Sequence, residues 1–392
     1  MRSANLTTLT DLTIWDGHRL LDADTLQWQG ERLTFVGHRD DLPAGVFARS
    51  CAGLTALPGL IDAHVHLELN PDDKAPPERT VADVVPLMRE RAEGMARAGI
   101  TTARDLGGGA WFELGLRDEI RQGAVVGPRL LCAGQPITTP HGHCHFWGGA
   151  ADSLDSAYQV LQRQVAHGVD LIKVMATGGR MTRGSEPTDA QFTVETLQAL
   201  VATAHAHELP VAAHCHGTEG IRRAAHAGVD TIEHCSWVGP DGWASDYQDS
   251  VAELILERGV WVSPTVNRGW QRMLDSPSGA VLGRVRRAYR KMLELGIPML
   301  ASTDAGIPGV YHADLPHALL VFAKIAELTP AETLRSATAD AAKALGIDHL
   351  TGTLATGKCA DVLLVDGNPL EDMSALTRAV AVYCRGRSAL TW

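Results

Sequence analysis

Several histidines stand where short apolar runs of the chain end, and their spacing suits metal binding. His64 and His66 lie two residues apart in AHVHL. In a β-strand, residues i and i+2 point to the same side, so both imidazoles are expected to point the same way. Such a pair provides two nitrogen ligands for a metal ion. The alternative is a pair of buried histidines that are hydrogen bonded within the core.

Two later runs end in the same way. His214 ends the apolar part of PVAAHCHG, His216 faces the same side as His214, and His234 ends TIEHC. Neutral imidazole is the commonest metal ligand in proteins. Imidazoles that converge without a partner would be desolvated polar groups, which is costly. The repeated placement therefore favours a shared site over separate core histidines.

Asp304 ends another apolar run, in LASTDAG. A buried carboxylate is costly unless it is paired or bound to a metal ion. The alternative is a helix N-cap, because Asp is favoured at that position. The residue type alone leaves both interpretations open.

Lys173 lies inside the apolar run LIKVMA. Lysine is almost never fully buried unless it is paired, and desolvation lowers its pKa and so populates the neutral amine. A neutral amine can react with carbon dioxide to form a carbamate, an anionic oxygen donor that can bridge two cations. The alternative is a buried ion pair between Lys173 and an aspartate.

The runs that carry these residues have the pattern of buried parallel strands. They are short, apolar and rich in β-branched residues, and amphipathic stretches such as 81–98 and 193–207 follow them. Strands that alternate with helices indicate a parallel sheet covered on both faces, and eight of them over about 250 residues fit a (β/α)8 TIM barrel. The expected strands lie in 59–67, 99–108, 128–134, 169–179, 209–217, 229–236, 260–266 and 297–306.

The two ends of the chain differ from its middle. Residues 8–57 and 351–392 contain short alternating segments separated by Gly, Asp and Pro turns, which is typical of strands and turns. The sequence therefore predicts an α/β protein with a barrel over 58–350. Residues 1–57 and 351–392 are predicted to pair into a small β-sandwich domain.

Composition narrows the class of protein. The 392 residues include 35 Lys and Arg against 46 Asp and Glu, which gives a net charge of −11. A hydrophobic fraction of 45% argues against disorder, and the acidic balance argues against a nucleic-acid partner. No run is long and apolar enough for a membrane span. The seven cysteines form no short-spaced framework, and no secretory signal is evident, so we expect a cytoplasmic protein.

Taken together, these residues resemble the amidohydrolase superfamily, in particular its binuclear members with a carboxylated lysine. The resemblance covers almost the whole chain and rests on PGLIDAHVH, on the order of the candidate ligands and on the closing GKCADVLLVDGNP. VDLIKVMATGG, AAHCHGTEGIRRAAHAGVDTIEH and TDAG look like the branch of Xaa-Pro dipeptidases (prolidases), to which imidazolonepropionase is more distantly related.

The resemblance implies a ligand set for two divalent metal ions, zinc being expected and Mn, Co or Fe being alternatives. His64, His66 and Asp304 would hold the more buried ion, and His214 and His234 the more exposed one. The Lys173 carbamate, derived from carbon dioxide, and a hydroxide would bridge them. Asp304 would accept a proton from the bridging water and deliver it to the leaving amine.

The resemblance also implies substrate contacts in the loops that follow the strands. His143 matches the family's loop histidine that binds the substrate carbonyl, with His141 and His145 as rivals in HGHCHF. Arg180 and Arg183 follow the fourth strand and can bind a carboxylate; the alternative for both is a solvated loop charge. Trp147, Trp237 and Trp270 can supply apolar pocket walls, the alternative for each being ordinary core packing, and they are not counted among the site residues.

The sequence thus predicts a hydrolase that cleaves an amide C–N bond of a dipeptide or an N-acyl amino acid, and we expect a homo-oligomer. The His-rich loop keeps a second substrate class open: a non-peptide amide, a cyclic amide, a carbamate, a urea or a lactone. A catalytically silent binding protein is disfavoured because every expected ligand is present. A nucleophilic Cys144 is disfavoured because it would leave Lys173 and Asp304 unexplained.

Overall fold

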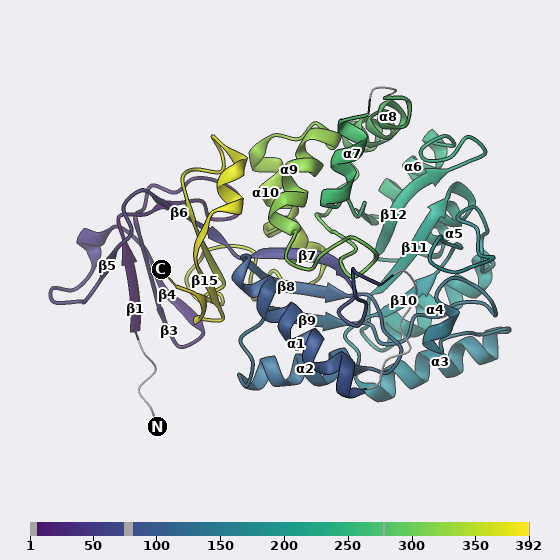
Figure 1. Ribbon diagram of the computed structural model, residues 1–392, viewed down its shortest axis with the longest axis horizontal. Helices are drawn as coiled ribbons and strands as arrows, with labels where there is room; N and C mark the ends of the chain where they lie inside the picture. The colour runs from purple at the N-terminus through teal and green to yellow at the C-terminus, as the bar shows by residue number, and fades with distance from the viewer. Residues whose placement is uncertain (1–5, 74–80, 277–278, 392) are drawn as a thin grey trace.

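The computed structural model describes residues 6–73, 81–276 and 279–391. The fold is mixed α/β, as the sequence predicts. Figure 1 shows a strand-rich region that contains the first and last parts of the chain, beside a larger region in which helices surround parallel strands. No helix within the described ranges is both long and apolar enough to span a bilayer.

The strands of the larger region are all parallel to their neighbours. Three form a sheet in the order β7-β8-β9, and four form a second sheet in the order β10-β11-β12-β13. Their burial on both faces explains why each reads as an almost continuous apolar run. Their bounds are β7 (Leu60–Val65), β8 (Ile100–Asp105), β9 (Arg129–Cys132), β10 (Ile172–Met175), β11 (Val211–Gly217), β12 (Thr231–Val238) and β13 (Trp261–Ser263).

Single parallel bridges join segments outside the named strands to the second sheet. Ile137 bridges to Val174 of β10, and Val262 of β13 bridges to Met299. The sequence predicts an eighth strand over 297–306, but this segment forms isolated bridges rather than a regular strand. Pro298 has no N–H to donate, and the backbone of Asp304 is left-handed, with φ of 62°.

The helices follow the strands along the chain. The stretches expected to be helical at 81–98 and 193–207 are α1 and α4, and the Thr193 hydroxyl caps α4 by accepting from the Thr196 N–H. The helices are α1 (Val81–Arg97), α2 (Phe112–Gln122), α3 (Leu154–His167), α4 (Val194–Ala206), α5 (Thr218–Ala227), α6 (Asp249–Glu257), α7 (Gln271–Leu274), α8 (Ala280–Leu295), α9 (Leu315–Ala326), α10 (Pro330–Ser336) and α11 (Ala339–Ala344).

The strand-rich region contains two sheets, ordered β4-β3-β1-β5 and β16-β15-β14-β6-β2. The second sheet joins the two ends of the chain, because β6 pairs antiparallel with β14, with Pro58 opposite Val362. The strands are β1 (Leu6–Thr10), β2 (Thr13–Ile14), β3 (Thr25–Gln29), β4 (Arg32–Gly37), β5 (Arg49–Ser50), β6 (Leu54–Pro58), β14 (Val362–Asp366), β15 (Ala379–Cys384) and β16 (Arg387–Leu390).

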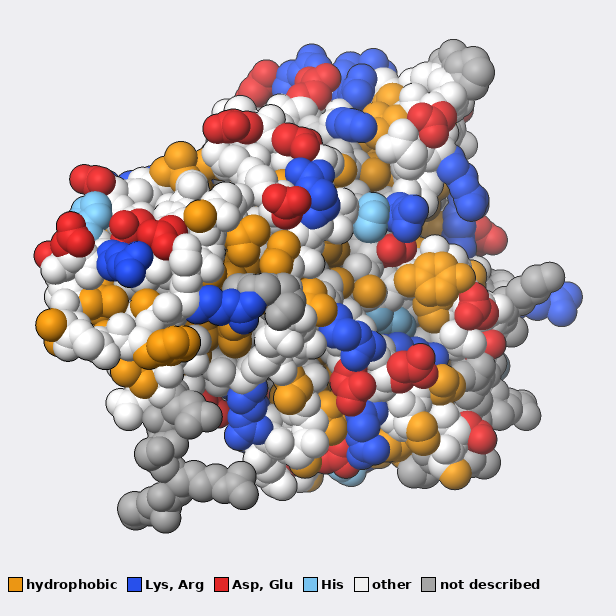
Figure 2. Space-filling view, turned by 60° about the vertical axis from the view of Figure 1, so that its left-hand side comes forward, with side chains coloured by type: hydrophobic (Ala, Val, Ile, Leu, Met, Phe, Trp, Pro, Cys, Tyr) orange, Lys and Arg blue, Asp and Glu red, His pale blue; other side chains and the backbone are white. Residues whose placement is uncertain are grey.

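These two sheets share one hydrophobic cluster. Leu9 and Trp28 come from the first sheet, and Val362 and Leu364 from the second. The contact between the ends of the chain is therefore a packed core as well as a strand pairing. On the face seen in Figure 2, acidic and basic side chains are interspersed over the surface of this region and of the helices beside it.

Candidate active site

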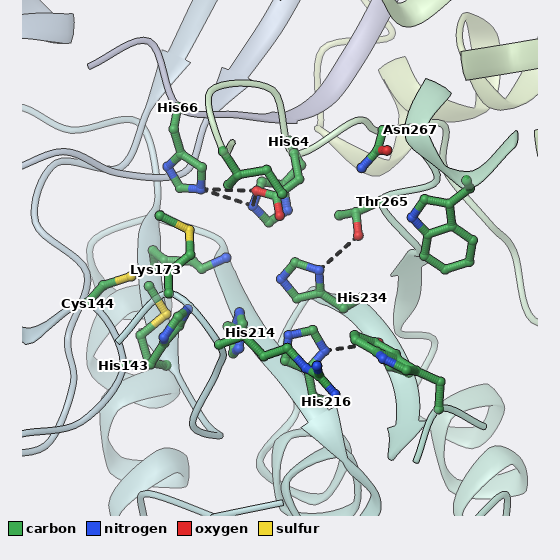
Figure 3. A pocket seen from close by; sticks show the side chains of 18 of the residues that line it. His64, His66, His143, Cys144, Lys173, His214, His216, His234, Thr265 and Asn267 are labelled. Carbon is green, nitrogen blue, oxygen red and sulfur yellow. Dashed lines mark hydrogen bonds and ion pairs between the residues drawn. The ribbon is translucent and has the colours of Figure 1, made fainter. Parts of the chain in front are cut away.

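A cavity of about 360 Å³ lies where the parallel strands end. Its walls bring together residues that are up to 243 positions apart in the sequence, from His64 to Ile307, and Figure 3 shows many of them around the cavity. Of the residues predicted to form the site, the cavity is lined by His64, His66, His143, Lys173, Arg180, His214, His234 and Asp304. Arg183 is exposed and is not among the lining residues.

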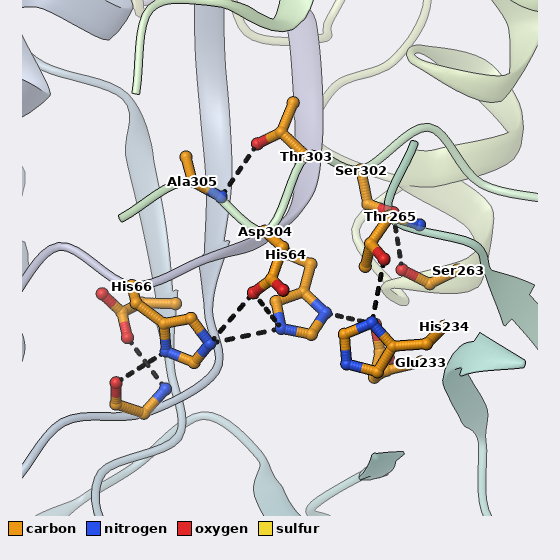
Figure 4. Close-up of polar contacts among 12 residues, drawn as sticks. His64, His66, Glu233, His234, Ser263, Thr265, Ser302, Thr303, Asp304 and Ala305 are labelled. Carbon is orange, nitrogen blue, oxygen red and sulfur yellow. Dashed lines mark hydrogen bonds and ion pairs between the residues drawn. The ribbon is translucent and has the colours of Figure 1, made fainter. Parts of the chain in front are cut away.

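The first group of candidate ligands is His64, His66 and Asp304. The Nε2 atoms of the two histidines are 3.3 Å apart, and Asp304 Oδ1 lies 3.3 Å from Nε2 of His64 and 3.4 Å from Nε2 of His66 (Figure 4). His64 is the last residue but one of β7 and His66 directly follows the strand, so both side chains stand at its carboxyl end. The Asp304 N–H donates to the carbonyl of His64 and so holds Asp304 beside them. Asp304 does not cap a helix, since the next described helix, α9, begins at Leu315.

The other ring nitrogens of these histidines determine where their protons are. His64 Nδ1 lies 2.9 Å from Glu233 Oε2, and His66 Nδ1 lies 2.9 Å from the Gly107 carbonyl. Both partners are acceptors, so each Nδ1 carries the hydrogen and each Nε2 presents a lone pair. Burial, together with the nearby Lys173 amine, lowers the pKa of His64 to about 4.

This arrangement fits a metal ion. Two imidazole lone pairs and a carboxylate oxygen face one another with no hydrogen between them, which is repulsive unless a cation lies among them. Ligands about 2.0–2.1 Å from one tetrahedral ion are about 3.3–3.4 Å apart, which is the spacing found here. Burial opposes ionisation of Asp304, but His64, His66 and Lys173 outweigh it and lower the pKa of its carboxyl group.

The second group consists of His214, His216 and His234, each of which offers a ring nitrogen within 4.8 Å of the others. Burial lowers the pKa of all three, so the rings are neutral and able to act as ligands. His214 Nε2 donates to the Gly178 carbonyl at 3.1 Å, which leaves its Nδ1 free. His234 Nδ1 lies 2.8 Å from the Thr265 hydroxyl.

His216 lies in this group, although only His214 and His234 were expected as ligands of the second ion. Its Nδ1 lies 3.0 Å from the Ser236 hydroxyl, and its ring stacks on that of His234 at 4.5 Å. The signal was its position two residues after His214, which the strand alternation places on the same side.

Lys173 lies on β10 and is only 1% exposed. Its amine points into the cavity between the two histidine groups (Figure 3). Burial lowers the pKa of Lys173 to about 8, although Glu233 and Asp304 act in the opposite direction. About a tenth of this amine is therefore neutral at pH 7, and the neutral amine is the nucleophilic form.

The His-rich loop presents one of its three histidines to the cavity. His143 is buried and lines it, His141 is exposed, and His145 is partly buried, with its Nδ1 bonded to the Gly142 carbonyl. The His143 ring lies 4.5 Å from that of His214, and burial lowers its pKa to about 4. His143 is thus a neutral group beside the candidate metal ligands.

Aromatic side chains form part of the cavity wall. Of the three tryptophans considered for the wall, Trp147 and Trp270 line the cavity and Trp237 does not. Trp237 is fully buried against Tyr247 instead, because the backbone of β12 is left-handed at this residue, with φ of 50°. Trp243 takes its place in the wall, and the Arg180 guanidinium lies 5.7 Å from the centre of its ring.

Sequence reasoning missed two residues beneath the cavity. Glu233 is fully buried and accepts from His64 with one oxygen and from Arg104 with the other, at 2.9 and 2.7 Å. Burial raises the pKa of Glu233, but Arg104 and His64 outweigh burial and lower it overall. Arg104 lies on β8 and also donates to the Ala63 carbonyl, so the carboxylate that orients His64 is itself held in place.

Comparison with known proteins places these features in a family. The chain is 27% identical to ochratoxinase from Aspergillus niger over 94% of its own length and 82% of that protein. It is 24% identical to imidazolonepropionase from Vibrio cholerae, over 89% and 88% of the two chains. A crystal structure of a Xaa-Pro dipeptidase with methionine bound in its active site superimposes with a TM-score of 0.86 at 26% identity, over 98% and 99% of the two chains.

The family itself follows from a match over most of the sequence. Residues 55–388, which include every candidate ligand described above, match the Amidohydrolase family. Relatives in this family are hydrolases that act on C–N bonds, and the candidate ligand groups fit the divalent metals that such enzymes use. The chain belongs to the Amidohydrolase family and is an enzyme of that class.

Proposed function

We propose that the protein is a binuclear metal-dependent hydrolase that cleaves the amide C–N bond of a dipeptide or an N-acyl amino acid, as a Xaa-Pro dipeptidase does. The observation that carries this proposal is the placement of two ligand groups and a buried lysine around one cavity. Two ions need a bridging anion between them, and Lys173 is the residue in position to provide one.

The proposed ligands follow from the two groups. His64, His66 and Asp304 would hold one ion and His214 and His234 the other, and a Lys173 carbamate would supply an anionic ligand to both. The neutral Lys173 amine adds to carbon dioxide, which forms an N–C bond and releases one proton. Imidazole and carboxylate donors suit zinc, with manganese, cobalt or iron as alternatives. Divalent ions held here supply a Lewis acid for a carbonyl oxygen and make water more acidic.

The side chains around these ligands have separate tasks. Asp304 is ionised, so it accepts the proton of the attacking water and returns it to the leaving nitrogen. An amide nitrogen is a poor leaving group unless it is protonated. His143 donates a hydrogen bond to the substrate carbonyl, and Arg180 at the rim binds a substrate carboxylate. Arg183 is exposed and does not line the cavity, so a substrate contact by it is not part of this proposal.

The substrate class rests on the cavity and on the relatives. Arg180 offers the cation that a free carboxylate needs, and the dipeptidase structure carries methionine, an amino acid, in its active site. The second candidate is a non-peptide substrate: an amide, a cyclic amide, a carbamate, a urea or a lactone. The apolar part of the cavity wall favours this second candidate, since Trp147, Met175 and Trp270 can pack against an uncharged hydrophobic group of the substrate.

The second part of the proposal concerns the fold that positions this site. We propose that the parallel segments close into a (β/α)8 barrel over 58–350, with 1–57 and 351–392 forming the β-sandwich beside it. The bridges at Ile137, Met299 and Ala305, which join neighbouring segments around the ring, support closure. In such a barrel the active site lies at the carboxyl ends of the strands. A homo-oligomeric, cytoplasmic enzyme without a nucleic-acid or membrane partner remains our expectation.

The test combines metal analysis with a substrate screen. The protein is loaded with zinc in bicarbonate buffer, its metal content is measured, and turnover is followed with Xaa-Pro dipeptides, N-acyl amino acids, carbamates and lactones. We expect two ions per chain and turnover of the first two classes. Turnover of carbamates or lactones alone would support the second candidate, and metal binding without any hydrolysis would contradict both.

A further inference from the structure

The hydroxyl of Thr182 lies between the active-site loop and His143. Its Oγ1 accepts the backbone N–H of Cys144 at 2.9 Å and lies 3.3 Å from Nδ1 of His143. Both side chains are buried, at 5% exposure each. The backbone N–H of Cys144 therefore occupies one acceptor position of the hydroxyl. The hydroxyl hydrogen and the second lone pair remain for the contact with the imidazole.

Two arrangements of the hydrogens are possible in this contact. If Thr182 donates to His143 Nδ1, the hydroxyl gives one hydrogen bond and accepts one, and both groups are satisfied. If Nδ1 donates instead, the hydroxyl hydrogen has no acceptor among the described residues, and a buried donor is left without a partner. Leaving a buried donor unsatisfied is costly, so the first arrangement is favoured.

We propose that Thr182 is a positioning residue that fixes the tautomer of His143, with the ring hydrogen on Nε2. This inference rests on the proposed function, in which His143 meets the substrate carbonyl. Because Nδ1 is turned to Thr182, the Nε2 edge of the ring remains for the cavity that His143 lines. An Nε2–H donates to a carbonyl oxygen, whereas the other tautomer would present a lone pair to it and repel it.

The segment after β10 also fixes the position of the ring. A Cβ at Gly179 would lie 2.5–2.8 Å from three atoms of the His143 imidazole, so the ring packs directly on the Gly179 backbone. The neighbouring Gly178 carbonyl accepts from Nε2 of His214. One short segment thus contacts a nitrogen of each histidine: the Thr182 hydroxyl meets Nδ1 of His143, and the Gly178 carbonyl accepts from Nε2 of His214.

The direct test is the tautomer itself, read by NMR from ¹⁵N-histidine in the zinc-loaded protein. The His143 signals are assigned by their loss in His143→Gln. In the wild-type protein we expect a hydrogen on Nε2 and a bare Nδ1. In Thr182→Val, which cannot donate, we expect the Nδ1–H form to appear, and in Thr182→Ser we expect the wild-type pattern. A wild-type ring with its hydrogen on Nδ1, or an unchanged ring in Thr182→Val, overturns the proposal.

Kinetics provide a second readout. If His143 polarises the carbonyl, Thr182→Val lowers kcat on the order of 100-fold, the size of a lost oxyanion donor, while Thr182→Ser, which keeps the hydroxyl donor, retains most of the wild-type activity. An equal loss in both variants would indicate a structural role and contradict the proposal. The NMR measurement needs no substrate, so failure of the proposed function would appear separately, as a wild-type enzyme that hydrolyses no amide.

Discussion

Oε2 of Glu233 lies 2.9 Å from Nδ1 of His64, and both side chains are buried. The other oxygen of the same carboxylate pairs with Arg104 at 2.7 Å. One carboxylate therefore orients a candidate metal ligand and neutralises a buried guanidinium. Partners of this kind fix the tautomer of a ligating histidine and tune its basicity.

The first prediction concerns Glu233→Gln. A glutamine can accept from His64 with its carbonyl, but its NH₂ group then faces the Arg104 donors, and the buried cation loses its counter-charge. We expect zinc affinity to fall about 10- to 100-fold and the free energy of unfolding to fall by about 3–5 kcal/mol. Metal titration and urea denaturation measure the two effects.

The matched control is Glu119→Gln, which breaks the largely exposed pair of Glu119 with Arg89. An exposed pair contributes about 0.2–1 kcal/mol, and this one is not part of the cavity. If Glu233→Gln behaved like this control in both measurements, the role assigned to the Glu233–His64 contact would be wrong.

Sequence reasoning missed Glu233 for a definite physical reason. Strand alternation places Glu233 and His234 on opposite sides, so choosing His234 as a ligand excludes its neighbour. The backbone at His234 is left-handed, with φ of 67°, and this breaks the alternation. Glu233 can then contact His64 while His234 still lines the cavity. A single backbone angle of this kind leaves no mark in the sequence pattern.

Other parts of the fold were open to prediction because burial alone specifies them. The runs around β7, β11 and β12 are apolar because both faces of the parallel strands are covered. The segment at 297–306 was harder, since its composition is that of a strand while Pro298 and the left-handed Asp304 prevent a regular ladder. That Trp243 lines the cavity while Trp237 is buried elsewhere likewise depends on the backbone conformation, which is left-handed at Trp237.

The second prediction concerns Glu113, a fully buried residue of α2 whose two carboxyl oxygens have no hydrogen-bond partner among the described residues. Burial, reinforced by nearby Asp105, raises its pKa to about 8 from an ordinary 4.5. Between these values the folded state holds a proton that the unfolded state has lost. The contribution of Glu113 to stability therefore falls as the pH rises from about 4.5 to 8, by about 1.4 kcal/mol per pH unit for one proton.

The variant Glu113→Gln removes this titration. Its stability relative to the wild-type protein should rise steadily between pH 5 and 8, as urea denaturation at several pH values will measure. Glu257→Gln, at an exposed end of α6, is the control and should run parallel to the wild-type curve. A constant difference between Glu113→Gln and the wild-type protein would show that Glu113 is ionised throughout.

The third prediction concerns Lys173→Met, which keeps the apolar stem and removes the amine. If Lys173 carries the proposed carbamate, its loss removes the anion shared by the two proposed ions, so we expect the metal content to fall from two ions per chain to about one. Activity should fall about 10³-fold or more, as for other groups that act at the reacting centre. Mass spectrometry of metals and steady-state rates measure these effects. Full metal content and full activity in Lys173→Met would eliminate the carbamate.

The last prediction separates the two arginines that follow β10. Arg180 lines the cavity beside the Trp243 ring, whereas Arg183 is exposed outside it. Arg180→Met should raise KM about 10- to 100-fold for substrates with a free carboxylate, because a hydrogen bond to a charged group contributes about 1.5–3 kcal/mol. Its kcat should change little, and KM for the corresponding C-terminal amides should not change. Arg183→Met is the matched control, and we expect wild-type kinetics from it. If both variants raise KM equally, the carboxylate is attracted by the overall charge of the loop, and Arg180 makes no specific contact with it.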